Sequence, residues 1–337
     1  MLHFIIIHIF RKKIKMTNEK KFIPIVDIVK AAACIMIFLY HCNTILPAGW
    51  KFLTVLGQDM GNNLFFMVSG FALASSIRKT PGNEFLSWYK RRLVRILPIT
   101  FLAYFGAFLM GFYSLTSLSQ LVTVFIYPTL YWFVSAILIY YILLFIIGKN
   151  TKGREQILIA GFIFILFAIF SERQEKLYLI GLLAMLSGFI LREKIDEIDF
   201  NAKEIPKFFS SRFLIFGISL MAFIIGKPGN IRYFSSILTD IGVIGVGSSL
   251  LMIGYGKNKT LSEFFTENKA ASAVIKYIGG MALPIYLVQC FCSGYIGYMI
   301  SLLIPFPRSF LVNFVVIWGI GTVLYYISRF CTKKFSA

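Results

Sequence analysis

Long apolar stretches recur along this chain, and they constrain its fold more than any other feature. Hydrophobic residues make up 58% of the sequence, and the mean hydropathy is +0.77. A run of about 20 apolar residues can cross a bilayer as a helix, and in lipid only helices and closed barrels satisfy their backbone hydrogen bonds. We therefore expect an all-α fold, a polytopic transmembrane helical bundle.

The apolar stretches predict about ten spans. Their approximate ranges are 25–46, 61–78, 94–113, 130–148, 156–171, 177–191, 212–226, 236–255, 276–303 and 310–331. The fifth and sixth are short, and the alternative is a single re-entrant hairpin, which leaves about eight crossings. Both counts place the two termini on the same side of the membrane.

Positive charge is unevenly divided between the two sides of this bundle. If the N-terminus is cytoplasmic, most of the 34 Lys and Arg residues fall on that side, including those of Arg11–Lys21 and Arg78–Arg95. This bias fits the positive-inside rule with both termini cytoplasmic. Anionic inner-leaflet lipid also attracts such segments, so the net charge of +19 predicts membrane lipid as a partner and no nucleic acid.

The predicted organisation is one domain with short ends. We expect a cytoplasmic N-terminal segment over 1–24, a transmembrane domain over 25–331 and a cytoplasmic tail over 332–337. The apolar start is too short for a span, and its basic cluster follows the apolar run, unlike that of a signal peptide. Translation from Met16 would make 1–15 a start-site extension. The five cysteines show no disulfide or zinc spacing, and we expect no metal site.

Two ionisable side chains lie inside the first predicted span. Lys30 and His41 are eleven residues apart, so they share one helical face at a separation of roughly 16 Å along the axis. Ionisable groups are costly inside a membrane and indicate function. Simpler readings exist for both: a lysine that snorkels to the headgroups, and a histidine that hydrogen-bonds near the outer helix end.

Four further motifs follow in order. They are Phe65-Phe66-x-x-Ser69-Gly70-Phe71 in the second span, Arg92-x-x-Arg95-Ile96-x-Pro98 in the loop after it, Tyr131-Trp132 at the start of the fourth, and Tyr286-Leu287-x-Gln289 in the ninth. With Lys30 and His41 they resemble the acyltransferase-3 family of integral membrane O-acyltransferases, which includes bacterial glycan O-acetyltransferases. Its usual marks are an Arg, ten residues and a His in the first span, then Phe-Phe-x-x-Ser-Gly-Phe, then Arg-x-x-Arg-Ile-x-Pro. The resemblance covers nearly the whole chain.

The resemblance implies transfer of an acyl group, most often acetyl, from cytoplasmic acyl-CoA to a hydroxyl of a glycan. We accordingly expect acetyl-CoA or another acyl-CoA as the donor substrate and no tightly bound cofactor. The acceptor would be a cell-envelope or exported polysaccharide or a lipid-linked saccharide, and the location the bacterial inner membrane, with several passes. The acyl chain, the hydroxyl modified and the oligomeric state stay open.

The sequence departs from the family pattern at two positions. Lys30 stands where Arg is usual, and a lysine lacks the planar guanidinium that forms bidentate hydrogen bonds with phosphate or carboxylate. Gln289 stands where His is frequent, so a titratable group is missing there. The first change keeps the positive charge, whereas the second removes proton-transfer chemistry from that position.

The catalytic candidates are His41 and Lys30. His41 can act as a general base on the acceptor hydroxyl or carry the acyl group on its imidazole, and the sequence does not separate these roles. Lys30 can hold a donor phosphate or a developing negative charge. Arg92 and Arg95 are the candidates for binding the acyl donor, although the basic residues that flank them also set topology.

Six residues are candidates for the acceptor site or for supporting it: Asn63, Ser69, Trp132, Asp240, Tyr286 and Gln289. Ser69 has a simpler role in close helix packing beside Gly70. Trp132 can face a sugar ring or belong to an aromatic belt. Asp240 can orient His41 as carboxylates do in hydrolytic triads, although capping a helix start is the simpler function.

A transporter or flippase for a lipid-linked sugar is the alternative function, with Lys30, His41 and Asp240 along a polar path. Transporters often contain two related halves with broken helices at corresponding positions. Gly279-Gly280 and Pro284 are expected to interrupt the ninth span, but the first half offers no counterpart. The ordered motifs therefore favour the enzyme.

Overall fold

Helices form the regular structure throughout the described part of the chain, which confirms the all-α prediction. The computed structural model describes residues 23–111, 117–125, 131–170, 176–197, 217–222, 232–256, 258–291 and 296–335. The α-helices are α2 (Pro24–His41), α3 (Phe52–Leu56), α4 (Asn62–Lys79), α5 (Phe85–Leu109), α6 (Leu118–Phe125), α7 (Trp132–Asn150), α8 (Arg154–Ile169), α9 (Lys176–Glu197), α11 (Arg232–Gly256), α12 (Asn258–Glu267), α13 (Lys269–Phe291), α14 (Gly297–Leu303) and α15 (Arg308–Phe335). A π-helical segment, η3 (Gly57–Gly61), leads into α4.

Six helical segments among the described residues are long and apolar enough to cross a membrane. They are Pro24–Thr44, Gly82–Leu109, Trp132–Asn150, Ile237–Tyr255, Lys269–Gln289 and Arg308–Lys334. The fifth and sixth predicted spans correspond to two separate helices, α8 and α9. Of the predicted span 212–226, only residues 217–222 are described, and they are helical. The N-terminal segment proposed over 1–24 lies almost wholly outside the described residues.

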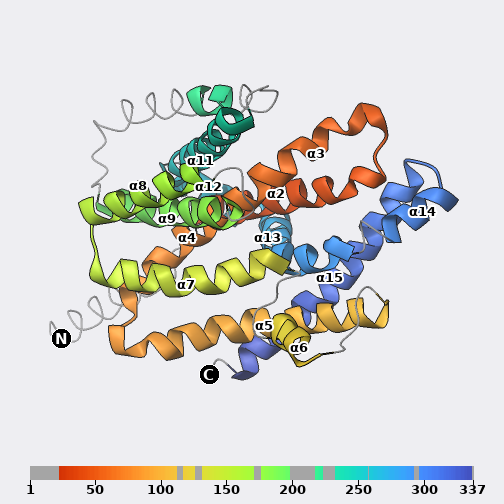
Figure 1. The fold of residues 1–337 in the computed structure, drawn as a ribbon, viewed down its shortest axis with the longest axis horizontal. Helices are drawn as coiled ribbons and strands as arrows, with labels where there is room; N and C mark the ends of the chain where they lie inside the picture. Colours follow the sequence, from red (N-terminus) through yellow and green to blue (C-terminus); the bar gives the residue numbers. More distant parts are fainter. Residues whose placement is uncertain are drawn as a thin grey trace, which may run out of the picture.

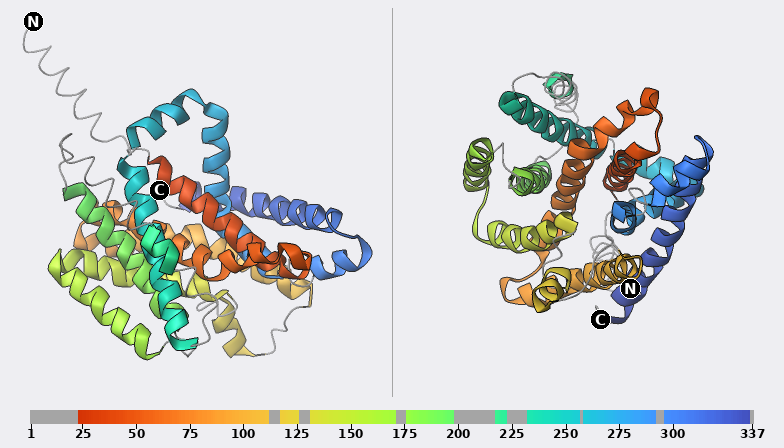
Figure 2. Two further views of the ribbon diagram at one scale, coloured as in Figure 1. Left: turned by 90° about the horizontal axis from the view of Figure 1, so that it is seen from above. Right: turned by 45° about the vertical axis from the view of Figure 1, so that its right-hand side comes forward.

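Helix α2 lies in the middle of the bundle, in contact with α4, α11, α12 and α13 (Figure 1). Pro24 occupies its first turn, where a missing N–H costs no helical hydrogen bond. Helices α8 and α9 lie on one side of the molecule, and α14 and α15 lie on the opposite side (Figures 1 and 2). The central position of α2 brings both predicted catalytic residues into the bundle.

Helices α4 and α9 make the most extensive helix contact among the described residues, and glycines allow their backbones to approach closely. A Cβ built on Gly70 would lie 1.8 Å from the Met185 carbonyl oxygen, and one built on Gly188 would lie 2.0 Å from the Met67 carbonyl oxygen. Both contacts are with backbone atoms, which cannot move aside as a side chain does. Without a hydrophobic driving force between helices in lipid, such close packing is a main source of association.

The outer surface is apolar, as a lipid environment requires. On α8, Ile157, Leu158, Phe162, Ile165 and Ile169 are each more than half exposed. Exposed Val315, Val323, Tyr326 and Phe330 give α15 a similar face. Apolar exposure on this scale is untenable in water and matches a helix bundle surrounded by acyl chains.

Three sequence expectations about where helices begin, end or break are wrong. The segment Tyr89–Pro98, expected as a loop, lies inside α5, because the stretch from Phe85 to Leu97 contains no helix breaker and Trp88 anchors it in the core. The predicted span 276–303 is not one helix, since α13 ends at Phe291 and α14 starts at Gly297. Conversely, α13 continues through Gly279-Gly280 and Pro284, which were expected to interrupt it.

Candidate functional site

A cavity of about 420 Å³ lies within the bundle, near the end where α4 finishes and α5 begins. Four predicted site residues line it: Lys30 from α2, Ser69 from α4, and Arg92 and Arg95 from α5. The other lining residues are Phe65, Ala72, Leu73, Ser76, Arg91, Ile96, Phe133, Ile137, Tyr141, Gly279, Gly280, Leu283 and Thr332. We call this the first cavity. Its described lining contains four cations and no carboxylate, which favours an anionic occupant.

Arg92 is held rigidly at the wall of the first cavity. Its guanidinium carbon lies 3.6 Å from the centroid of the Trp88 ring. Nη1 donates to the Trp88 carbonyl at 2.7 Å, and Nη2 donates to Ser76 Oγ at 2.7 Å. Stacking and hydrogen bonding together fix the plane of the guanidinium before any ligand arrives.

Ser76 completes this arrangement. Its Oγ accepts one hydrogen bond from Arg92 Nη2 and another, at 3.0 Å, from Trp88 Nε1. Both lone pairs of the hydroxyl are therefore engaged, and its proton has no acceptor within the described part of the chain. Ser76 lines the first cavity, so this O–H is available to donate to a ligand there.

Lys30 faces the interior of the bundle. It lines the first cavity, and a Cβ built on Gly279 of α13 would lie 3.6 Å from Lys30 Cβ. Asp27, one turn earlier in α2, interacts electrostatically with Lys30, Lys276 and Arg95. A snorkelling lysine would instead extend over a lipid-facing surface towards the headgroups. Lys30 instead lies beside the first cavity, so its position does not match that of a snorkelling lysine.

Ser69 contributes to packing more than to reactivity. Its Oγ donates to the Phe65 carbonyl at 2.7 Å, within the same helix. The neighbouring Gly70 makes the close contact with α9. A nucleophilic serine needs a base within hydrogen-bonding distance, and no base bonds to Ser69 within the described residues.

His41 lies at the other end of α2 from Lys30. It is the last residue of that helix, and its ring centroid is 5.2 Å from that of Tyr40. It is absent from the described lining of the first cavity, and its imidazole makes no hydrogen bond within the described part of the chain. The helical rise places it roughly 16 Å from Lys30 along the axis. The two catalytic candidates therefore share a helix but not an enclosed pocket.

Asn63 and Asp240 pair with each other rather than with His41. Asn63 Nδ2 donates to Asp240 Oδ1 at 3.5 Å, and both side chains are buried. This contact joins α4 to α11. Asp240 does not cap a helix start, because α11 begins eight residues earlier at Arg232; the boundary was misjudged because the helix extends beyond its apolar core. An orienting role towards His41 stays a prediction, without a hydrogen bond to support it.

The aromatic candidates lie where α7 meets α13. Tyr131 Oη donates to the Leu287 carbonyl at 2.9 Å. The Tyr286 ring centroid lies 5.0 Å from that of Phe133, a residue of the first cavity. Trp132 begins α7, and its ring centroid is 6.0 Å from that of Phe66. Ring contacts therefore connect Trp132 and Tyr286 to Phe133, which lines the first cavity.

Gln289 is buried in the same helix as Tyr286, one turn further on. Only 1% of its surface is exposed, and its Oε1 has no hydrogen-bond partner within the described residues. A buried amide oxygen without a partner is costly. Gln289 therefore keeps an acceptor oxygen inside the bundle, although its amide cannot transfer protons.

Sequence reasoning did not single out Ser76, Trp88, Tyr141 or Asp27. Trp88 lies one helical turn before Arg92, so the pair was visible as an i, i+4 spacing once the segment was recognised as helical. Ser76 and Tyr141 come from other helices, and only the tertiary fold places them beside Arg92 in the first cavity.

The fold and the cavity together define a multi-pass membrane protein with a cationic pocket inside its helical bundle. The profile of the acyltransferase-3 family, described as an acyltransferase domain, matches residues 23–328. The chain belongs to this family, and the resemblance drawn from the motifs is confirmed. No curated protein and no solved structure gives a significant match.

Proposed function

We propose that this membrane acyltransferase moves an acetyl group from acetyl-CoA to a hydroxyl of a cell-envelope or exported polysaccharide. The first cavity is the observation that carries the proposal. It collects Lys30, Arg91, Arg92 and Arg95 in one space, with no carboxylate among the described lining residues. A CoA thioester carries several phosphate charges, and this cluster of cations complements them.

Arg92 and Arg95 are the proposed phosphate ligands. The guanidinium of Arg92 is already oriented by Trp88 and Ser76, so little side-chain entropy is lost when a donor binds. Lys30 adds a third charge from α2, and its proposed role is to hold a phosphate or the developing charge of the donor. The Ser76 hydroxyl supplies a neutral hydrogen-bond donor at the same wall.

His41 is the proposed proton acceptor. As the acceptor oxygen attacks the thioester carbonyl, its proton passes to the imidazole, the C–S bond breaks and the proton returns to the thiolate as CoA leaves. The alternative is an acyl-imidazole intermediate, in which the same nitrogen attacks first and the glycan hydroxyl then receives the acyl group. Each sequence of steps requires the donor to extend from the first cavity along α2 to His41.

The proposed topology has about ten spans, both termini in the cytoplasm and one transmembrane domain over residues 25–331. The positive-inside bias supports this orientation. CoA is a cytoplasmic metabolite, and this orientation places the first cavity on its side of the membrane. The proposed location is the bacterial inner membrane, and the proposed acceptor is a glycan or lipid-linked saccharide near the opposite face.

The test uses purified protein in liposomes with labelled acetyl-CoA and an envelope glycan as acceptor. We expect label on the glycan when acetyl-CoA is supplied on the face that bears the two termini, and none when it is supplied only on the other face. Movement of unlabelled glycan across the bilayer, without any transfer of label, would refute the enzyme and support a transporter.

Replacement of Arg92 by lysine tests the donor site. Lysine keeps the charge but loses the stack on Trp88 and the hydrogen bond to Ser76. We expect the KM for acetyl-CoA to rise about tenfold while kcat stays within about threefold, because a planar, bidentate group is replaced by a point charge. Steady-state transfer in the liposome assay measures both constants.

Lys90→Ala is the matched control for this change. Lys90 is exposed on the same helix and is not among the described residues lining the first cavity. Its loss should leave the KM unchanged. Equal KM values for wild type and Arg92→Lys would exclude Arg92 from donor binding.

A further inference from the structure

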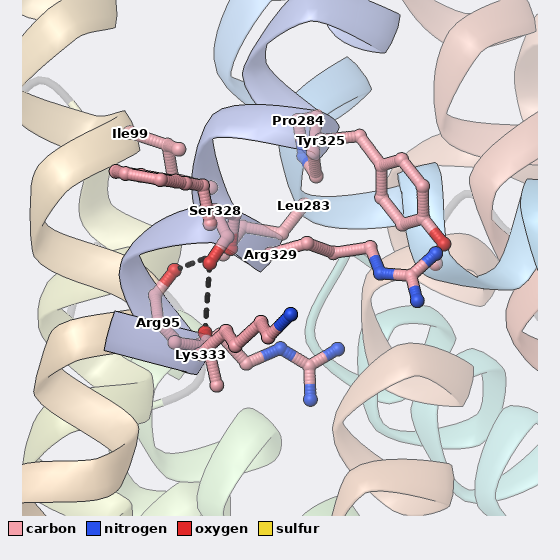
Figure 3. Close-up of a pocket in the computed structure, with 11 residues that line it drawn as sticks. Arg95, Ile99, Leu283, Pro284, Tyr325, Ser328, Arg329 and Lys333 are labelled. Atoms are coloured by element: carbon pink, nitrogen blue, oxygen red, sulfur yellow. Dashed lines mark hydrogen bonds between the residues drawn. The ribbon is translucent and has the colours of Figure 1, made fainter. Parts of the chain in front are cut away.

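A second cavity, of about 590 Å³, lies between α5, α13 and α15 (Figure 3). Its lining residues are Arg95, Ile99, Gly280, Leu283, Pro284, Tyr325, Ser328, Arg329, Phe330, Thr332 and Lys333. Arg95, Gly280, Leu283 and Thr332 also line the first cavity. The two spaces therefore adjoin at these four residues.

The second cavity is strongly cationic. Arg95 from α5 and Arg329 and Lys333 from α15 contribute three positive charges, and its described lining contains no carboxylate. Arg329 and Lys333 are four residues apart and share a helical face, where like charges destabilise a helix. All three side chains are exposed enough to meet a ligand from solution. An anion between them would relieve the repulsion.

The cationic wall is positioned by contacts between α5 and α15. Ser328 Oγ donates to the Arg95 carbonyl at 3.0 Å, and Thr332 Oγ1 donates to the Ser328 carbonyl at 2.8 Å (Figure 3). The first of these bonds ties the backbone at Arg95 to the helix that carries Arg329 and Lys333. The positive charges of the two helices are thereby held around one space.

An aromatic ring lies beside these cations. The guanidinium carbon of Arg329 is 5.7 Å from the centroid of the Tyr325 ring. A Cβ built on Gly280 would lie 2.7 Å from Tyr325 Cε2, so the absence of a side chain at Gly280 makes room for the ring at the wall common to both cavities. Cations combined with an aromatic face suit a phosphorylated nucleoside better than a simple anion.

We propose that the second cavity binds the 3′-phosphorylated adenosine end of the acyl-CoA donor, with Arg329 and Lys333 on its phosphates and Tyr325 beside its base. This inference rests on the proposed function. Arg95, which lines both cavities, would then contact the donor where it passes from one to the other. The remainder of the donor would occupy the first cavity and lead towards His41.

Direct nucleotide binding tests this site without requiring turnover. The protein is reconstituted in nanodiscs of phosphatidylcholine alone and titrated calorimetrically with adenosine 3′,5′-bisphosphate and with adenosine 5′-monophosphate. We expect the bisphosphate to bind about tenfold more tightly, because a second phosphate adds charge-assisted hydrogen bonds. Arg329→Ala and Lys333→Ala should each weaken bisphosphate binding about tenfold, so that the bisphosphate and the monophosphate bind with similar affinity. Lys333→Arg should restore the tighter binding of the bisphosphate.

Lys334→Ala is the matched control. Lys334 is adjacent to Lys333 in the same helical turn, but it lies 5.8 Å from the Phe330 ring centroid and is not among the described residues lining the second cavity. The Lys334→Ala variant should bind the bisphosphate as tightly as wild type does. If Arg329→Ala and Lys333→Ala also bind like wild type, or if wild type does not distinguish the two nucleotides, the inference is refuted.

An anionic lipid headgroup offers the same phosphate chemistry as the nucleotide. The nucleotide titration is the first arm of the test, and a second arm measures binding of this lipid. Wild type and Lys333→Ala are reconstituted with phosphatidylglycerol, and the lipid retained on repurification is measured by mass spectrometry. Lipid retention that depends on Lys333, without nucleotide binding in the first arm, would assign the cavity to lipid and refute the inference. If nucleotides bind as expected but acetyl transfer is absent from wild type, the proposed reaction fails and this site stands.

Discussion

Substitution of His41 by alanine is expected to lower acetyl transfer by about 10²- to 10⁴-fold, the usual contribution of a general base. An acyl-imidazole route would lose at least as much, because the nucleophile itself would be removed. The KM for acetyl-CoA should change little, since His41 is not among the described residues lining the first cavity. Transfer in the liposome assay, at saturating and limiting acetyl-CoA, measures the two effects separately.

His41→Gln separates loss of chemistry from loss of shape. Glutamine is polar and similar in reach, and it can occupy the space beside Tyr40, but it cannot accept the proton. We expect it to be as inactive as alanine while binding the donor normally. Glycan labelling within twofold of wild type in either variant would remove His41 from the mechanism.

Substitution of Gly70 by leucine is expected to prevent the bundle from assembling. The new Cβ would meet the Met185 carbonyl oxygen at 1.8 Å, so α4 and α9 would have to separate along their closest contact. Overpacking of a rigid interior costs about 1–3 kcal/mol or more, and a clash with backbone belongs at the upper end of that range. Thermal melting and the monodisperse fraction in size-exclusion chromatography measure the loss.

Gly106→Leu is the matched control, because Gly106 lies within α5 and a Cβ there would meet nothing within 4 Å. The same substitution should leave the folded fraction and the melting temperature close to those of wild type. A monodisperse Gly70→Leu variant that melts with wild type would show that the α4–α9 contact is not needed for folding.

The helices of this fold were largely predictable because apolar length determines what can cross a bilayer. The predicted first, second, fourth and last spans correspond to α2, α4, α7 and α15 within a few residues. The start of α5 was missed because its first turns are basic and aromatic, so apolar length gives no signal there. What holds them helical is tertiary: Trp88 is fully buried and bonds to Ser76 of α4.

The sequence predicted several residues of the candidate site, but it did not predict which of them line the same cavity. Motif order indicated Lys30, Arg92 and Arg95 separately, and the fold brings all three to one cavity. The pairing of Asn63 with Asp240 depends on how α4 and α11 pack, which spacing along the chain does not encode. The cations of α15 looked like topology signals, and only the packing of α5 against α15 places them beside Arg95.

The unbroken helix from Pro24 to His41 has a consequence for how such enzymes diversify. Its hydrogen-bonded backbone keeps Lys30 and His41 at a constant separation along the axis. Changes of side-chain rotamer alone cannot bring the two side chains into contact. If the donor and the acceptor bind as proposed, their selectivities are set by residues at opposite ends of one helix, and substitutions at one end should change one selectivity and not the other.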